Sequence, residues 1–271
     1  MSIVRNGAAE LAYEARGIGL PVLLMHAGVT DRRGWAPLIA HLGEGFRTIA
    51  YDRRGFGETT YEPEAHDPVA DAIAVLDAED VDRAVVIGAS NGGRWGIELT
   101  LAHPERVAAL VLIGAGTRGG PEDDPTDYSQ DVQALWHEYE AAEESHDLNA
   151  LNRVEAHAWL DGWAAPDGRV SGAARDLFLA MNAIALSSPD PGPERERPPA
   201  WDLVSRITVP TLVLCGDLDV VCLPASEHFA ATIPGARFEL LADTGHLPHL
   251  EGHPRSLAAI AEFLATLRLE A

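Results

Sequence analysis

The most regular feature of the chain is a series of short apolar runs rich in valine, isoleucine and leucine. Continuous apolar character indicates strands that are buried on both faces, as in a parallel sheet. Between several runs, apolar residues recur with the helical period, as Val69, Ile73 and Leu76 do. The predicted strands span residues 21–25, 47–51, 83–87, 107–113, 211–215 and 237–241, and the predicted helices span residues 67–78, 92–102, 227–232 and 255–267.

The alternation of strands with helices predicts an α/β fold with a mostly parallel, doubly wound sheet. Residues 5–16 differ from the other strands because their apolar and polar positions alternate more strictly, and they contain Asn6-Gly7. This pattern predicts an antiparallel edge strand or a hairpin at the start of the chain.

One long region breaks the alternation of strands and helices. Residues 117–205 contain no strand-like run but have three segments with helical periodicity, at 127–145, 148–160 and 173–187. We interpret this region as a helical cap inserted into an α/β core that is formed by residues 1–116 and 206–271. The alternative is a set of ordinary helices that cover the core.

Charge and composition narrow the classes of partner. The 271 residues include 20 basic and 42 acidic side chains, which gives a net charge of −22 at neutral pH. A surface this acidic repels phosphate backbones and anionic lipid, so we expect neither nucleic-acid binding nor membrane binding. All 20 basic residues are arginine, which excludes mechanisms that need a lysine amine, such as a Schiff base.

Cysteine usage and hydropathy predict where the protein works. Cys215 and Cys222 are too few for a disulfide scaffold and suit a reducing compartment. No stretch approaches the roughly 18 apolar residues of a membrane span, and residues 1–10 lack the apolar segment of a signal peptide. We therefore expect a cytoplasmic protein, and the sequence leaves open whether it forms a homodimer.

The clearest chemical motif is Gly88-Ala89-Ser90-Asn91-Gly92, which lies between a predicted strand and a predicted helix. A G-x-S-x-G sequence in that setting forms a tight elbow and presents its serine at the carboxyl end of the sheet. The strained turn requires close neighbours without side chains, which accounts for the two glycines. Ser90 is therefore the candidate nucleophile, and the alternative is a glycine-rich turn with an inactive serine.

Serine becomes a good nucleophile when a base takes its proton, and that base must lie on another loop at the same end of the sheet. His246 follows the last predicted strand, directly after Gly245, and is the candidate base. A carboxylate that orients the base is expected after the preceding strand, where Asp217 and Asp219 are both available. We assign Asp219, which lies further into its loop, and expect Asp217 to support the turn.

The oxyanion that forms in such a reaction needs backbone N–H donors. One donor is expected from Asn91, the residue after the nucleophile. The other is expected from the loop that follows an early strand, where Gly28 is the candidate and His26 is expected to brace the loop. The alternative for Gly28 is an ordinary turn glycine.

Together these motifs make the chain resemble proteins of the α/β-hydrolase fold, and among them the small bacterial serine esterases and lactonases. The resemblance covers residues 20–115 and 205–268. The order Ser90, Asp219, His246 is the order of that family. Two departures are Ala27, where the family usually has glycine, and Asn91, where many relatives carry an apolar residue. The motifs that carry the resemblance are His26-Ala27-Gly28, Tyr51-Asp52-Arg53-Arg54-Gly55-Phe56-Gly57, the Ser90 elbow, Gly216-Asp217-x-Asp219 and Gly245-His246.

The resemblance implies a serine hydrolase that cleaves a small or medium carboxylic ester, thioester or lactone through an acyl-enzyme on Ser90, with no metal or organic cofactor. The same fold and triad also serve carbon–carbon bond hydrolases, lyases and perhydrolases, and non-catalytic small-molecule receptors. The spacing of His246, His249 and His253 also fits a metal site, but a metal site leaves the serine elbow unexplained.

Substrate selection is expected to depend on the predicted cap. Trp159 and Trp163 are four residues apart, so one helical face can present both above Ser90 as an apolar pocket wall. Packing of the cap against the core is the alternative for both tryptophans. Trp35 is a candidate for the pocket floor or for the core, and Arg94, one helical turn after Ser90, is a candidate for binding a substrate carboxylate.

Overall fold

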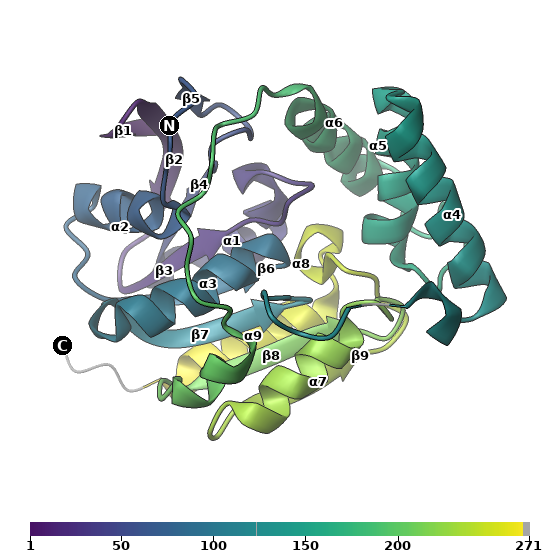
Figure 1. The fold of residues 1–271 in the computed structure, drawn as a ribbon. Coiled ribbons are helices and arrows are strands. Elements are labelled where there is room, and N and C mark those ends of the chain that lie inside the picture. The colour runs from purple at the N-terminus through teal and green to yellow at the C-terminus, as the bar shows by residue number, and fades with distance from the viewer. Residues whose placement is uncertain (123, 268–271) are drawn as a thin grey trace.

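The computed structural model describes residues 1–122 and 124–267, which form one nine-stranded sheet with helices on both faces (Figure 1). The order is β1-β2-β4-β3-β6-β7-β8-β9, with β5 paired to β2. All pairs from β4 to β9 along this order are parallel, which confirms the predicted α/β class. The strands are β1 (Ser2–Asn6), β2 (Ala9–Arg16), β3 (Leu20–Met25), β4 (Phe46–Tyr51), β5 (Thr60–Tyr61), β6 (Ala84–Ala89), β7 (Val107–Ile113), β8 (Thr211–Gly216) and β9 (Arg237–Leu241).

The first two strands form the predicted hairpin. β1 and β2 pair antiparallel, with Asn6 opposite Ala9. Gly7 in the turn has a φ of +58°, a conformation that glycine adopts at little cost. β2 then pairs antiparallel with β4, so the hairpin extends one side of the parallel sheet.

The helices cover both faces of the sheet because successive strand residues point to opposite sides. In β6, Val86 packs in the same cluster as Trp95 of α3, whereas Val85 and Ile87 pack in the cluster that contains Leu38 of α1. No helix within the described residues is both long enough and apolar enough to cross a bilayer. The core helices are α1 (Ala36–Leu42), α2 (Pro68–Ala78), α3 (Asn91–Ala102), α7 (Leu223–Thr232), α8 (Pro248–Glu251) and α9 (Pro254–Thr266), with the short 3-10 turns η1 (Arg32–Trp35), η2 (Gly43–Gly45), η3 (Pro104–Arg106) and η4 (Pro125–Asp127).

A second group of helices lies together to one side of the sheet, at the right of Figure 1. It consists of α4 (Gln130–Ser145), α5 (Leu148–Glu155), the π-helical segment η5 (Ala156–Gly162) that continues α5, and α6 (Ala173–Ser187). Residues of α4, α5 and η5 form a small apolar cluster, whereas Phe178 and Met181 of α6 pack in the core cluster that contains Leu38. Arg169 ties the group to the core through Glu251, at 2.6 Å, and through the carbonyl of Asp243, at 3.0 Å.

The end of the predicted cap region, 117–205, lies on the core. After α6 the chain runs back across the sheet's helices as an extended segment (Figure 1). The His66 N–H donates to the Pro193 carbonyl at 3.0 Å, and the Arg195 N–H donates to the His66 carbonyl at 2.7 Å. The segment leads into η6 (Trp201–Arg206), where Trp201 stacks on His228 of α7 with a centroid separation of 3.8 Å.

Candidate active site

Ser90 occupies the sharp turn between β6 and α3. Its φ of 51° and ψ of −121° lie in a region that side-chain-bearing residues rarely adopt. A Cβ on Gly88 would lie 2.5 Å from the carbonyl oxygen of Gly92, and a Cβ on Gly92 would overlap the carbonyl oxygen of Met25. The turn can therefore be this tight because both neighbours lack side chains, and Ser90 stays partly exposed.

The Gly92→Ala substitution should test this account of the elbow. The clash is with backbone atoms of Met25 and His26, which cannot rotate away. We expect a loss of at least about 3 kcal/mol in unfolding free energy and a fall of about 100-fold in any Ser90-dependent activity, because the nucleophile shifts. Gly116→Ala is the matched control, since a Cβ there has no neighbour within 4 Å. Equal thermal unfolding midpoints for the two variants would contradict the account.

Gly28 and Asn91 meet because of the strand order. β3 pairs with β4 on one side and with β6 on the other, so the strand order reverses between β3 and β6, and ligands of such sheets usually bind at the carboxyl ends of the strands at that point. Gly28 follows β3 and Asn91 follows the β6 elbow, and a Cβ on Gly28 would lie 3.9 Å from Asn91 Nδ2. Within the described residues neither backbone N–H donates to a protein acceptor, so both are available to a ligand oxygen.

The loop that carries Gly28 is braced by a buried histidine. His26 Nδ1 donates to the Ala27 carbonyl at 2.7 Å, and its Nε2 accepts the Arg53 N–H at 3.0 Å. Burial, with Arg53 nearby, holds the pKa of His26 well below its usual value, so the ring is neutral and has the tautomer that this pattern needs. These bonds fit the predicted bracing role.

Asp219 and His246 are directly joined. They lie on the loops after β8 and β9, and Asp219 Oδ2 accepts a hydrogen bond from His246 Nδ1 at 2.7 Å. Both side chains are buried, at 0% and 1% exposure, and no described residue bonds His246 Nε2. Asp217 instead accepts the Thr244 N–H at 3.2 Å and so holds the turn. His246 Nε2 is therefore available to exchange a proton with a group that is not among its present hydrogen-bond partners.

Residues at the end of β7 contact both Ser90 and the Asp219–His246 pair. The Ser90 N–H donates to the carbonyl of Ile113, the last residue of β7, at 2.8 Å. The next residue is Gly114, where a Cβ would lie 2.8 Å from His246 Nδ1 and 2.9 Å from Asp219 Oδ2. Ser90, Asp219 and His246 thus lie on the loops at the carboxyl ends of four adjacent strands, β6 to β9.

The comparisons with known proteins agree with this geometry. The family described as the alpha/beta hydrolase fold matches residues 21–253. The chain belongs to this family. It is 27% identical to the 2-hydroxymuconate semialdehyde hydrolase of Pseudomonas sp. (strain CF600), over 92% of this chain and 88% of that protein. It is 29% identical to the rhodomycin D methylesterase DauP of Streptomyces sp. (strain C5), over 93% and 94%. A malate-bound esterase structure from Thermogutta terrifontis superposes with a TM-score of 0.77 at 27% identity, covering 98% of each chain.

The three tryptophans predicted to contact substrate occupy different places in this α/β-hydrolase. Trp159, on η5, is partly exposed and faces His246 with a centroid separation of 4.9 Å. Trp163 is buried at 4% exposure and packs against Trp136 of α4 with a centroid separation of 5.3 Å. Trp35 is fully buried and stacks on His249 at 4.1 Å. We therefore assign Trp35 to the core and keep only Trp159 as a candidate substrate contact, with Trp163 packed against it.

The histidines near His246 serve packing and capping. His249 is completely buried against Trp35, and within the described residues neither of its ring nitrogens has a partner. His253 Nδ1 accepts the Ser256 N–H at 3.4 Å at the start of α9. A different set, Asp219, Cys222 and His246, has ligand atoms within 4.8 Å of one another, but the Asp219–His246 hydrogen bond already occupies two of them.

Acid stability should depend on His249. Burial, with His246 nearby, lowers the pKa of His249 from 6.5 to about 3, so between these values the unfolded chain binds a proton that the folded chain does not. The His249 contribution to stability is therefore lost as pH falls below about 6.5. From pH 8 to pH 5 the wild type should lose about 2 kcal/mol more unfolding free energy than His249→Phe, which keeps the stacked ring. Denaturant titrations of both proteins at pH 8 and pH 5 measure this. If the difference in unfolding free energy between the wild type and His249→Phe is the same at both pH values, the assignment is refuted.

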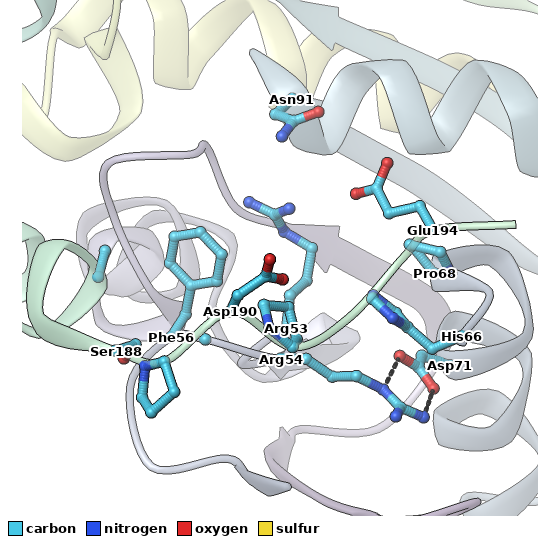
Figure 2. A pocket seen from close by; sticks show the side chains of 14 residues that line it. Arg53, Arg54, Phe56, His66, Pro68, Asp71, Asn91, Ser188, Asp190 and Glu194 are labelled. Carbon is cyan, nitrogen blue, oxygen red and sulfur yellow. Dashed lines mark hydrogen bonds and ion pairs between the residues drawn. The ribbon is translucent and has the colours of Figure 1, made fainter. Parts of the chain in front are cut away.

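Sequence reasoning missed a cavity of about 340 Å³ that reaches Asn91. Figure 2 shows Arg53 and Arg54 from the loop after β4, together with Asp190 and Glu194 from the extended segment. The predicted carboxylate-binding candidate, Arg94, is engaged elsewhere, because it pairs with Glu98 and Glu194, each at 3.3 Å. Arg53 belongs to the Tyr51–Gly57 motif, but nothing in the motif distinguishes it from the adjacent Arg54, which forms ion pairs with Asp71 and Glu64.

Proposed function

We propose that this α/β-hydrolase is a serine hydrolase that cleaves small or medium carboxylic esters, thioesters or lactones. The observation that carries the proposal is the Asp219–His246 pair, whose Nε2 has no partner among the described residues and which lies at the same end of the sheet as the strained, partly exposed Ser90. A buried carboxylate on Nδ1 fixes the imidazole tautomer that can accept a proton at Nε2. The esterase names of two relatives support the same class.

In the proposed reaction the acyl group is transferred first to Ser90 and then to water. Ser90 Oγ attacks the acyl carbon while His246 Nε2 takes its proton, and the Gly28 and Asn91 amides donate to the oxyanion. His246 then gives the proton to the departing alkoxide or thiolate, leaving an ester on Ser90. Water attacks that ester, again with His246 as base, and the carboxylic acid leaves as Ser90 regains its proton. Asp219 stabilises the imidazolium in both halves.

Trp159 is proposed as the apolar wall beside the reacting carbon. Its indole contacts the imidazole of His246, and Tyr139 and Trp163 support it at centroid separations of 6.4 and 5.3 Å. A flat aromatic surface in this position favours an apolar acyl or alcohol group and keeps bulk water from the imidazole.

Product analysis in ¹⁸O-labelled water tests the proposed reaction. The panel contains p-nitrophenyl butyrate, a thioester and a lactone, each followed by mass spectrometry. We expect many turnovers, with one ¹⁸O atom in the released acid and none in the alcohol. A folded protein that turns over no panel member, or one that places ¹⁸O in the alcohol, would overturn the proposal. Absence of turnover by the folded protein would favour a receptor or a lyase.

One relative favours a second candidate, the hydrolysis of a carbon–carbon bond. The substrate named for the Pseudomonas hydrolase, 2-hydroxymuconate semialdehyde, contains no ester group. The same serine, histidine and oxyanion donors can act on a ketone carbonyl. Cleavage of a vinylogous diketone by a protein that leaves every ester intact would select this candidate over ester hydrolysis.

A further inference from the structure

The cavity beside Asn91 has one unusual side chain, the guanidinium of Arg53. It is 7% exposed, and no carboxylate among the described residues forms an ion pair with it. Its Nη2 donates to the Ala27 carbonyl at 3.1 Å, its Nε has no partner among the described residues, and its Cζ lies 4.5 Å from the centre of the Phe56 ring. The adjacent Arg54 is fully paired, with Asp71 at 2.9 Å and Glu64 at 2.7 Å.

A buried charge without a counter-ion is costly, so it points to a ligand that supplies one. Burial lowers the pKa of Arg53 to about 10, which still leaves the guanidinium charged at neutral pH. Its bond to the Ala27 carbonyl and its stacking on Phe56 hold the side chain in place, and the nearby charge of Glu194 raises the pKa of Arg53 without forming an ion pair with it.

The position of Arg53 connects the cavity to the candidate reaction centre. Figure 2 shows its guanidinium directed toward Asn91, whose amide is one proposed oxyanion donor. The carbonyl that Arg53 contacts belongs to Ala27, the residue before Gly28, the other proposed donor. A ligand group bound at Arg53 would therefore be part of a molecule that extends from Ser90 along the cavity.

The cavity rim selects among anions. Glu194, which also pairs with Arg94, and the exposed Asp190 lie on the outer wall. A single guanidinium behind an acidic rim suits a singly charged, flat carboxylate, which it can bind through two parallel N–H bonds.

We propose that Arg53 binds a free carboxylate of the substrate, so that the preferred substrates are esters or lactones that also carry a carboxylate. This inference rests on the proposed ester hydrolysis for its catalytic readout. The site itself, a buried unpaired guanidinium lining a cavity, exists independently of that chemistry.

The test compares matched neutral and carboxylate-bearing esters. One series places the carboxylate on the acyl side, with monomethyl succinate, glutarate and adipate against methyl butyrate, valerate and hexanoate. A second series places it on the alcohol side, with butyryl glycolate against ethyl butyrate. The readout is the ratio of kcat/KM for each charged ester to that of its neutral partner, in the wild type, Arg53→Met and Arg255→Met. Arg255 is the matched control because it is an exposed arginine on α9 with its own acidic partners.

We expect the wild-type ratio to exceed one in at least one series and to fall at least about 10-fold in Arg53→Met, the value of a charge-assisted hydrogen bond. Arg255→Met should keep the wild-type ratio. If Arg53 only braces the Ala27 loop, both members of each pair lose activity equally and the ratio stays constant, which overturns the proposal. A wild type that prefers the neutral ester throughout both series overturns it as well.

A binding experiment separates failure of this inference from failure of the proposed function. Glutarate and its diamide are titrated calorimetrically into Ser90→Ala, with and without Arg53→Lys. Binding of glutarate but not of the diamide, weakened at least about 10-fold by Arg53→Lys because lysine cannot make the two-bond contact, supports the site even if no ester is turned over. Absence of glutarate binding to a folded Ser90→Ala protein overturns it.

Discussion

Ser90→Ala should lower kcat for ester hydrolysis by about 10⁵- to 10⁶-fold while the fold and its stability change little. In serine hydrolases with a triad, loss of the nucleophile removes the covalent route and leaves only the assistance of the oxyanion donors and of binding. Ser90 is partly exposed and makes no side-chain hydrogen bond within the described residues, so its hydroxyl contributes little to packing. Steady-state kinetics with p-nitrophenyl butyrate and a thermal unfolding scan measure the two effects.

Ser171→Ala is the control for this substitution, because Ser171 is an exposed serine between η5 and α6. It should keep wild-type kcat and KM. Residual activity of Ser90→Ala above about one hundredth of the wild-type value would mean that another group carries the reaction.

Asp219→Asn should lower kcat about 10⁴-fold with little change in KM, because an amide in place of the carboxylate favours the imidazole tautomer that cannot accept the serine proton. Asp217→Asn is the matched comparison, two residues away, and is expected to keep near-wild-type kcat, because the amide oxygen of asparagine can still accept the Thr244 N–H that Asp217 accepts. A measurement of kcat and KM for both variants decides between the two aspartates. Comparable kcat losses would contradict the assignment of Asp219 as the carboxylate that orients His246.

The sheet was predictable because burial on both faces leaves a direct trace in the sequence. The predicted strand 107–113 is β7, and the predicted helix 173–187 is α6. Local chemistry also located the hairpin turn at Gly7 and the elbow at Ser90, since each needs a backbone conformation that glycine or a strained turn provides. The helix α1 was missed because its seven residues are too few to show a clear period.

Features that depend on contacts between distant segments were not predictable in this way. The extended segment after α6 contains several prolines and has no periodicity, so its pairing with residues 64–66 left no trace in the pattern. Trp35 is fully buried because α8 brings His249 against it from more than 200 residues away. Arg53 and Arg54 are adjacent and identical in the sequence, and only the fold gives acidic partners to one and not to the other.

The central claim is that Ser90 is an activated nucleophile, and covalent labelling tests it most directly. The folded protein is treated with a fluorophosphonate, and its intact mass is measured for the wild type, Ser90→Ala and Asp219→Asn. The account predicts one adduct per wild-type chain, mapped to Ser90 by peptide analysis, with slower labelling of Asp219→Asn and none of Ser90→Ala. An unlabelled wild type, or equal labelling of Ser90→Ala, would contradict it.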